Sequence, residues 1–326
     1  MTWTGSVGAG ALRWVAVALV VAGAGCSKKP VQVRESAVRA LCFSEMPSDM
    51  KVMSPAIWKP ETLFQLLING YDKSTGKVPL PPTDCMGTPI LWQDPAPGEC
   101  DETAQEGTPL PIQPLTVQEM IVTEMRLDLK LVWAVVRRFS NGEAIGPVAL
   151  VEATPRGLAV RALGTLKAMP KSARLRMERV GGIEVLLVDG ERCWGPEGST
   201  QCQRMVRIMP LRGNRFVAEP LVSQENGKCM QPANIALSRT ASQPLPSRWL
   251  RKYEYTAALT VAPDGIRVAE QVTAKDSDPR QPSSPPRLFR KAQDERVIQV
   301  NQSRMAVNRS SVWNQLVEQG STEALP

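Results

Sequence analysis

The chain has 326 residues, a net charge of +7 and an apolar fraction of 43%, which suffices for one large core or two smaller ones. It contains no histidine. This composition excludes Ser-His-Asp and Cys-His nucleophilic catalysis, zinc sites that depend on imidazole, and pH switches built on histidine. The mild positive charge is not typical of nucleic-acid binding, so we expect no nucleic-acid partner.

The first 25 residues have the pattern of a secretory signal peptide. Arg13 precedes the apolar run Val15–Val21, and four small residues, 22–25, follow before Cys26. The apolar run is much shorter than the ~20 residues that a membrane-spanning helix needs. We therefore expect residues 1–25 to be removed on export.

Cys26 directly after Ala24 and Gly25 resembles the lipobox of bacterial lipoproteins, although Gly23 stands where that family usually has an aliphatic residue. The resemblance covers residues 1–29 alone. It implies that Cys26 carries fatty acid such as palmitate and becomes the first residue of the mature chain. Ser27 in place of aspartate implies anchoring in the outer membrane of a Gram-negative bacterium, facing the periplasm or the cell surface. The alternative is an ordinary cleaved signal with Cys26 as a later structural cysteine.

Residues 26–115 form an N-terminal region with little regular structure. Pro60 and Glu61 open the apolar run 62–68, and Gly70 follows it, which predicts one helix over about 60–69. Residues 79–114 are rich in proline and acidic residues, and prolines at this density prevent helices and central strands. We expect a solvated loop braced by disulfides.

Residues 116–310 are predicted to be mainly β. Asn141-Gly142 between the apolar runs 131–139 and 144–153 is a strong hairpin signal. Short turns separate further alternating runs, including 183–188, 205–209, 216–222, 253–261, 266–272 and 297–307. Such turns predict an antiparallel meander in the form of a curved sheet, a sandwich or a half-open barrel. Residues 311–318 are expected to form a short helix within a C-terminal tail, 311–326.

Six cysteines remain after Cys26, and an even number in an exported chain predicts disulfides. No pair has Cys-x-x-Cys spacing, so we expect no metal site. Cys85–Cys100 and Cys193–Cys202 would each close a short loop, which leaves Cys42–Cys229 as the third bridge.

Basic residues gather in the meander, and two of them share one face of a strand. They form a predicted patch for an anionic partner, or an ordinary solvated face, and consist of Arg156, Arg161, Lys167, Lys171, Arg174 and Arg176.

These features favour a non-enzymatic lipid-anchored envelope protein that acts as a binding or structural component of an outer-membrane assembly. Its partners would be the membrane, through the N-terminal lipid, and other envelope proteins, with no cofactor. One alternative is a periplasmic carrier of a lipid or small ligand, held in an apolar cavity of the curved sheet. Another is a hydrolase built on paired carboxylates.

Overall fold

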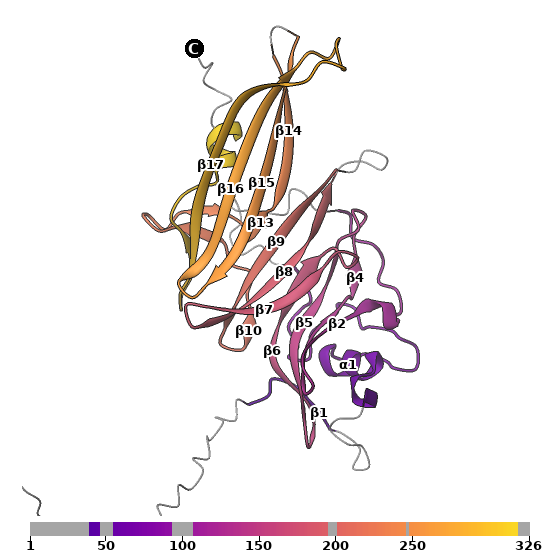
Figure 1. Cartoon of the computed structure of the whole chain (residues 1–326). Helices are drawn as coiled ribbons and strands as arrows, with labels where there is room; N and C mark the ends of the chain where they lie inside the picture. Colours follow the sequence, from indigo (N-terminus) through magenta and orange to yellow (C-terminus); the bar gives the residue numbers. More distant parts are fainter. Residues whose placement is uncertain (1–38, 46–54, 93–106, 195–200, 246–247, 319–326) are drawn as a thin grey trace, which may run out of the picture. The chain divides into compact units, whose positions relative to one another are not determined.

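A computed structural model describes residues 39–45, 55–92, 107–194, 201–245 and 248–318, which belong to one compact unit that begins at Arg39. These residues are mainly β and form two strongly curved sheets, one nearly closed and one half-open (Figure 1). The predicted fold class is confirmed. The predicted signal peptide and Cys26 lie outside the described residues.

The N-terminal part packs on the first sheet instead of forming a separate core. Its elements are β1 (Phe43–Glu45), η1 (Pro55–Trp58) and α1 (Pro60–Leu67). Pro60 occupies the first turn of α1, as predicted, and the helix buries its apolar face, Leu63, Phe64, Leu66 and Leu67. These side chains join a core cluster with residues of the first sheet, such as Val132 and Ala149.

The first sheet contains eleven of the described strands. Its main path has the order β2-β3-β5-β6-β10-β9-β8-β7, while β1 pairs with β6, β4 with β5 and β13 with β9. The bounds are β2 (Met120–Arg126), β3 (Leu129–Ala134), β4 (Arg137–Arg138), β5 (Ala144–Thr154), β6 (Gly157–Ala168), β7 (Arg174–Val180), β8 (Ile183–Trp194), β9 (Gln201–Arg212), β10 (Arg215–Phe216) and β13 (Asn234–Ala236). A short η3 (Val117–Glu119) precedes β2. The hairpin at Asn141-Gly142 is confirmed, with Gly142 at a φ of 84° in the turn.

The second sheet contains seven strands in the order β12-β11-β18-β17-β16-β15-β14. Their bounds are β11 (Leu221–Ser223), β12 (Cys229–Gln231), β14 (Ser238–Pro244), β15 (Leu250–Ala262), β16 (Gly265–Ser277), β17 (Arg287–Val300) and β18 (Met305–Val307). A helical turn, η4 (Asn314–Glu318), follows, where a short helix was predicted. Three long antiparallel strands, β15, β16 and β17, make the centre of this sheet (Figure 1).

The run 216–222, predicted as one strand, is split between the two sheets. Phe216 ends β10 in the first sheet, and Leu221 starts β11 in the second. Both short strands make parallel pairs, β10 with β6 and β11 with β18, whereas all neighbours in a meander are antiparallel. The chain crosses between the sheets here, and a crossover permits parallel pairing.

A shared apolar core joins the two sheets. Val185 and Ile208 of the first sheet belong to one buried cluster with Val268, Ile298 and Met305 of the second. Along β16 the burial alternates as expected for a strand with one face on a core. This shared core fixes the first sheet against the second and so positions the polar side chains where the two sheets meet.

The disulfide predictions Cys42–Cys229 and Cys85–Cys100 are wrong, because Cys42 is bonded to Cys85. The backbone brings the two together: the Leu41 amide donates to Val160 of β6, and the Cys85 amide donates to Leu67 at the end of α1. Cys193 and Cys202 lie directly opposite each other in the β8–β9 register, and Cys202 is disulfide-bonded. The Cys193 side chain and Cys100 lie outside the described residues, so Cys193–Cys202 stays a prediction.

Candidate functional site

A polar cavity of about 240 Å³ lies where the first sheet meets the second. Strands of both sheets and the segment before η4 line it. The side chains that decide its chemistry are Arg192, Gln203, Asn234, Arg239, Tyr255, Arg296 and Trp313. We call this the interface cavity.

One wall of the interface cavity is a buried network around Glu270. Arg296 Nε and the Tyr255 hydroxyl each donate to Glu270 Oε1 at 2.8 Å. The Ser311 hydroxyl and the Val312 amide donate to Glu270 Oε2 at 3.0 Å and 2.8 Å. The Glu270 carboxylate therefore has all the donors it can use, and it fixes Arg296 and Tyr255 at the cavity surface.

The network also explains the titration of Tyr255. Burial, and then the neighbouring Glu270 carboxylate, raise the pKa of the Tyr255 phenol well above its ordinary value. The phenol stays protonated and can donate only to Glu270, so it holds that carboxylate in place. Tyr255 also meets Trp313 edge to face, with ring centroids 5.9 Å apart.

A second buried charge cluster includes Arg192, which lines the cavity. Arg192 Nε lies 3.5 Å from Glu143 Oε1, and Lys167 Nζ lies 3.7 Å from Glu143 Oε2. All three side chains are at least nine-tenths buried. Lys167 Nζ is also 4.9 Å from the centroid of the Phe139 ring. One carboxylate thus faces two cations, and Arg192 extends from this cluster to the cavity.

The charges around the interface cavity favour an anion. Its lining contains three arginines, Arg192, Arg239 and Arg296, and no acidic side chain among the residues that the structure describes there. The Arg239 guanidinium lies over the Trp313 ring, 4.9 Å from its centroid. A concave site with surplus positive charge and low-dielectric walls attracts anionic groups.

Two half-buried amide side chains that line the cavity have buried atoms without hydrogen-bond partners among the described residues. They are Asn234, at both Oδ1 and Nδ2, and Gln203, at Oε1. Leaving a buried polar atom unpaired costs about 1–3 kcal/mol, and such atoms are rare in native structures. Water or a ligand with both donors and acceptors would complete these bonds.

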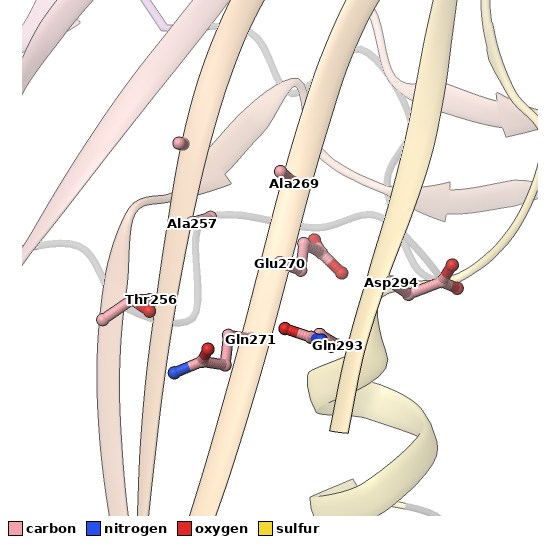
Figure 2. Close-up of a pocket in the computed structure, with 8 residues that line it drawn as sticks. Thr256, Ala257, Ala269, Glu270, Gln271, Gln293 and Asp294 are labelled. Atoms are coloured by element: carbon pink, nitrogen blue, oxygen red, sulfur yellow. The ribbon is translucent and has the colours of Figure 1, made fainter. Parts of the chain in front are cut away.

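A larger depression, about 500 Å³, crosses the middle of β15, β16 and β17 and is the weaker candidate. Figure 2 shows that Thr256, Gln271 and Gln293 extend to one side of the sheet, whereas Glu270 and Asp294 extend to the other. Ala258 and Ala269 face each other across the strands, and their small side chains create the hollow. The carboxylates of Glu270 and Asp294 are already paired with Arg296 and Arg309, so this depression presents mostly neutral groups.

The predicted basic patch does not gather into one accessible surface. Lys167 is buried with Glu143, Arg161 pairs with Glu152, and Arg176 pairs with both Glu178 and Asp189. Lys171 and Arg174 are exposed, and Arg174 shares a face of β7 with Arg176, as expected. Arg156 lies over the Phe43 ring.

None of the cavity residues was a predicted site residue, although the sequence contains a signal for two of them. Glu270 interrupts the inward series 266, 268, 272 and 274 of β16, and Arg296 interrupts the equivalent series of β17 before Ile298. A charged residue at an inward strand position must find a partner, which indicates a buried pair. No local sequence pattern indicates that Asn234 and Trp313 line the same cavity, because they come together only where the two sheets meet.

Comparison of the chain with protein-family models, with curated proteins and with solved structures finds no match. Within the described ranges, no three Cys, Asp or Glu side chains are grouped so that they could hold a metal ion. In the same residues, no helix has the length and apolar character needed to cross a membrane.

Proposed function

We propose that this chain is a non-enzymatic, lipid-anchored protein of the outer membrane that acts by binding, and that the interface cavity is its recognition site. The anchor would be Cys26. The observation that carries the recognition site is the set of unpaired amide atoms of Asn234 and Gln203 beside a surplus of positive charge. The occupant would be a compact group with an anionic acceptor, such as a carboxylate or a phosphate, and at least one N–H or O–H donor.

The size of the cavity supports binding to part of a larger partner. At about 240 Å³ it is smaller than the ~300–1,000 Å³ of typical pockets for whole small molecules. One charged side chain, chain terminus or sugar acid fits this space better than a lipid tail does. The polar lining also opposes the alternative of an apolar carrier cavity, since an alkyl chain would leave the amides of Asn234 and Gln203 unpaired.

The test is capture of partners from a detergent-solubilised envelope by the full chain, with the anchor intact. Asn234→Leu and Arg239→Gln should each reduce the captured partner at least about tenfold, because each removes groups that the partner would pair with. Arg267→Gln is the matched control: Arg267 is an exposed arginine of β16 that is paired with Asp264 and does not line the cavity. Equal capture by all forms would contradict the recognition site.

The anchor is tested separately. Cys26→Ala should move the protein from the membrane fraction to the soluble fraction, and labelled palmitate should appear on the unmodified chain alone. A Cys26→Ala protein that stays in the membrane fraction would contradict lipidation at this residue, whatever the outcome for the cavity.

A further inference from the structure

Two hairpin ends of the second sheet form a surface that the interface cavity does not involve. Pro244 pairs with Leu250 near the β14–β15 turn, and Asp276 pairs with Arg287 near the β16–β17 turn. Leu250 also pairs with Ser277, so both turns lie at the same end of the sheet (Figure 1). We call residues 244–245, 248–252 and 275–291 the basic tip.

The basic tip exposes large apolar side chains. Leu288 is 64% exposed and Phe289 is 43% exposed. With Leu245 and Trp249 they line an open depression of about 290 Å³. Neighbouring apolar side chains that gather on a surface, with basic residues around them, are a mark of an interaction site, whereas single exposed ones are not.

A β-bulge brings Leu288 and Phe289 to the same surface. Ala274 pairs with Arg290 and Lys275 pairs with Leu288, so Phe289 is the extra residue of β17 and has no partner in the register. A bulge interrupts the alternation of faces and re-aims a side chain. The Phe289 ring then lies 3.3 Å from the Arg251 guanidinium, which Asp276 holds by two hydrogen bonds of 2.8 Å and 2.9 Å. The Phe289 ring is therefore held in place by Arg251 although it is partly exposed.

Most of the net charge of the chain lies in the basic tip. Its segments contain eight Lys and Arg residues and two Asp residues, a surplus of six, while the whole chain has a net charge of +7. Asp276 and Asp278 are each paired with an arginine of the tip, Arg251 and Arg280. Lys252 and Lys275 are both paired with Glu254. Four exposed cations of the tip remain around the apolar side chains: Arg248, Arg287, Arg290 and Lys291.

From this juxtaposition we propose that the basic tip binds the surface of an anionic lipid bilayer. Trp249, Leu288 and Phe289 enter the headgroup region, where aromatic and aliphatic side chains are favoured. Arg287, Arg290 and Lys291 contact lipid phosphates, and each cation close to an anionic membrane raises the binding constant about fivefold. An acidic protein surface would also match the positive charge, but it would not need the apolar side chains. Removing the apolar side chains therefore distinguishes a bilayer from an acidic protein.

The test uses the chain as expected after export, residues 26–326, with Cys26→Ser, so that neither the apolar leader nor a lipid anchor contributes. It is mixed with vesicles of phosphatidylethanolamine containing phosphatidylglycerol, and with phosphatidylcholine vesicles, and the bound fraction is measured by sedimentation. We expect binding to the anionic vesicles alone, weakened by added salt. Trp249 emission should shift to shorter wavelength on binding, and the shift should be smaller in Trp249→Phe.

Two tip variants separate charge from insertion. Arg287→Gln/Arg290→Gln/Lys291→Gln should weaken vesicle binding about a hundredfold, by the fivefold factor for each cation. Leu288→Ser/Phe289→Ser should keep the salt dependence but lose most of the binding and the Trp249 shift. The control Lys73→Gln/Arg179→Gln/Arg267→Gln removes the same charge from exposed positions elsewhere and should bind as the parent does. Circular dichroism checks that each variant is folded.

Three results would overturn the proposal: no binding of the parent to anionic vesicles, equal losses in the tip and control triple variants, or full binding by Leu288→Ser/Phe289→Ser. The last result, together with capture of an acidic protein by the tip, would assign this surface to a protein partner instead. Because none of these substitutions touches the interface cavity, failure here leaves the recognition site of the proposed function untouched.

Discussion

Glu270 and Arg296 form an ion pair with less than 5% of either side chain exposed, and the Arg296 guanidinium spans the space between Glu270 and Gln231. It connects the centre of the second sheet with β12. A buried pair of this kind gives little net stability, but a single charge left in its place is expensive. The pair is therefore a sensitive reporter of the packing within the second sheet.

We expect Glu270→Gln to lower the free energy of unfolding by about 3–5 kcal/mol, because Arg296 then remains as an unpaired buried cation. Urea denaturation measures the change. Asp294→Asn is the matched control: Asp294 lies opposite Glu270 in the register, but its partner Arg309 is half exposed, so the cost should be at most about 1 kcal/mol. Similar costs for both variants would contradict the burial of the Glu270–Arg296 pair.

The raised pKa of Tyr255 predicts a loss of stability at alkaline pH. The folded state holds the proton to a higher pH than the unfolded state, whose tyrosines titrate near 10. The stabilisation is complete below pH 10 and is lost as the pH rises from there through the folded-state pKa, with a slope of about 1.4 kcal/mol per pH unit. Tyr255→Phe should remove this slope. Tyr255→Phe also loses the hydrogen bond from the hydroxyl to Glu270. Its free energy of unfolding should therefore be lower than that of the parent chain at pH 8, and the difference should shrink as the pH rises.

The measurement is urea denaturation at a series of pH values above 9, for the parent chain and for Tyr255→Phe. Parallel curves over that range would show that Tyr255 titrates normally and is not held by Glu270.

The Cys42–Cys85 bridge links β1 to the segment after α1 and closes a loop with a sequence separation of 43. In the chain-entropy account, a loop of this length contributes about 4 kcal/mol. Cys42→Ala/Cys85→Ala should lower the midpoint of thermal unfolding accordingly. Peptide mapping without reduction should find this bridge and, given the β8–β9 register, Cys193–Cys202, which leaves Cys100 for Cys229. A mapped Cys85–Cys100 bridge would contradict the fold of the N-terminal part.

The structural features that could be predicted from the sequence are those that depend on residues close together in the chain. The Asn-Gly turn, the first turn of α1 at Pro60 and the alternation along β16 each depend on a few adjacent side chains, and all three are confirmed. The pairing of Cys42 with Cys85 could not be predicted from spacing. Cys42 is positioned by the pairing of β1 with β6, and β6 lies more than a hundred residues later in the chain. The interface cavity was missed for the same reason: Asn234 and Trp313 become neighbours only when the two sheets share a core.

Gly146 of β5 provides a test of the closest backbone approach in the first sheet. A Cβ atom added there would lie 1.7 Å from the carbonyl oxygen of Ala134, a backbone atom that cannot move without shifting β3. We expect Gly146→Ala to lower the free energy of unfolding by at least about 3 kcal/mol, the upper part of the range for overpacking. Gly190→Ala in β8 is the matched control, since its nearest neighbour is the Ser172 hydroxyl at 3.6 Å. Urea denaturation of the two variants should differ clearly, and equal stability would mean that β3 and β5 do not approach as closely as the structure has them.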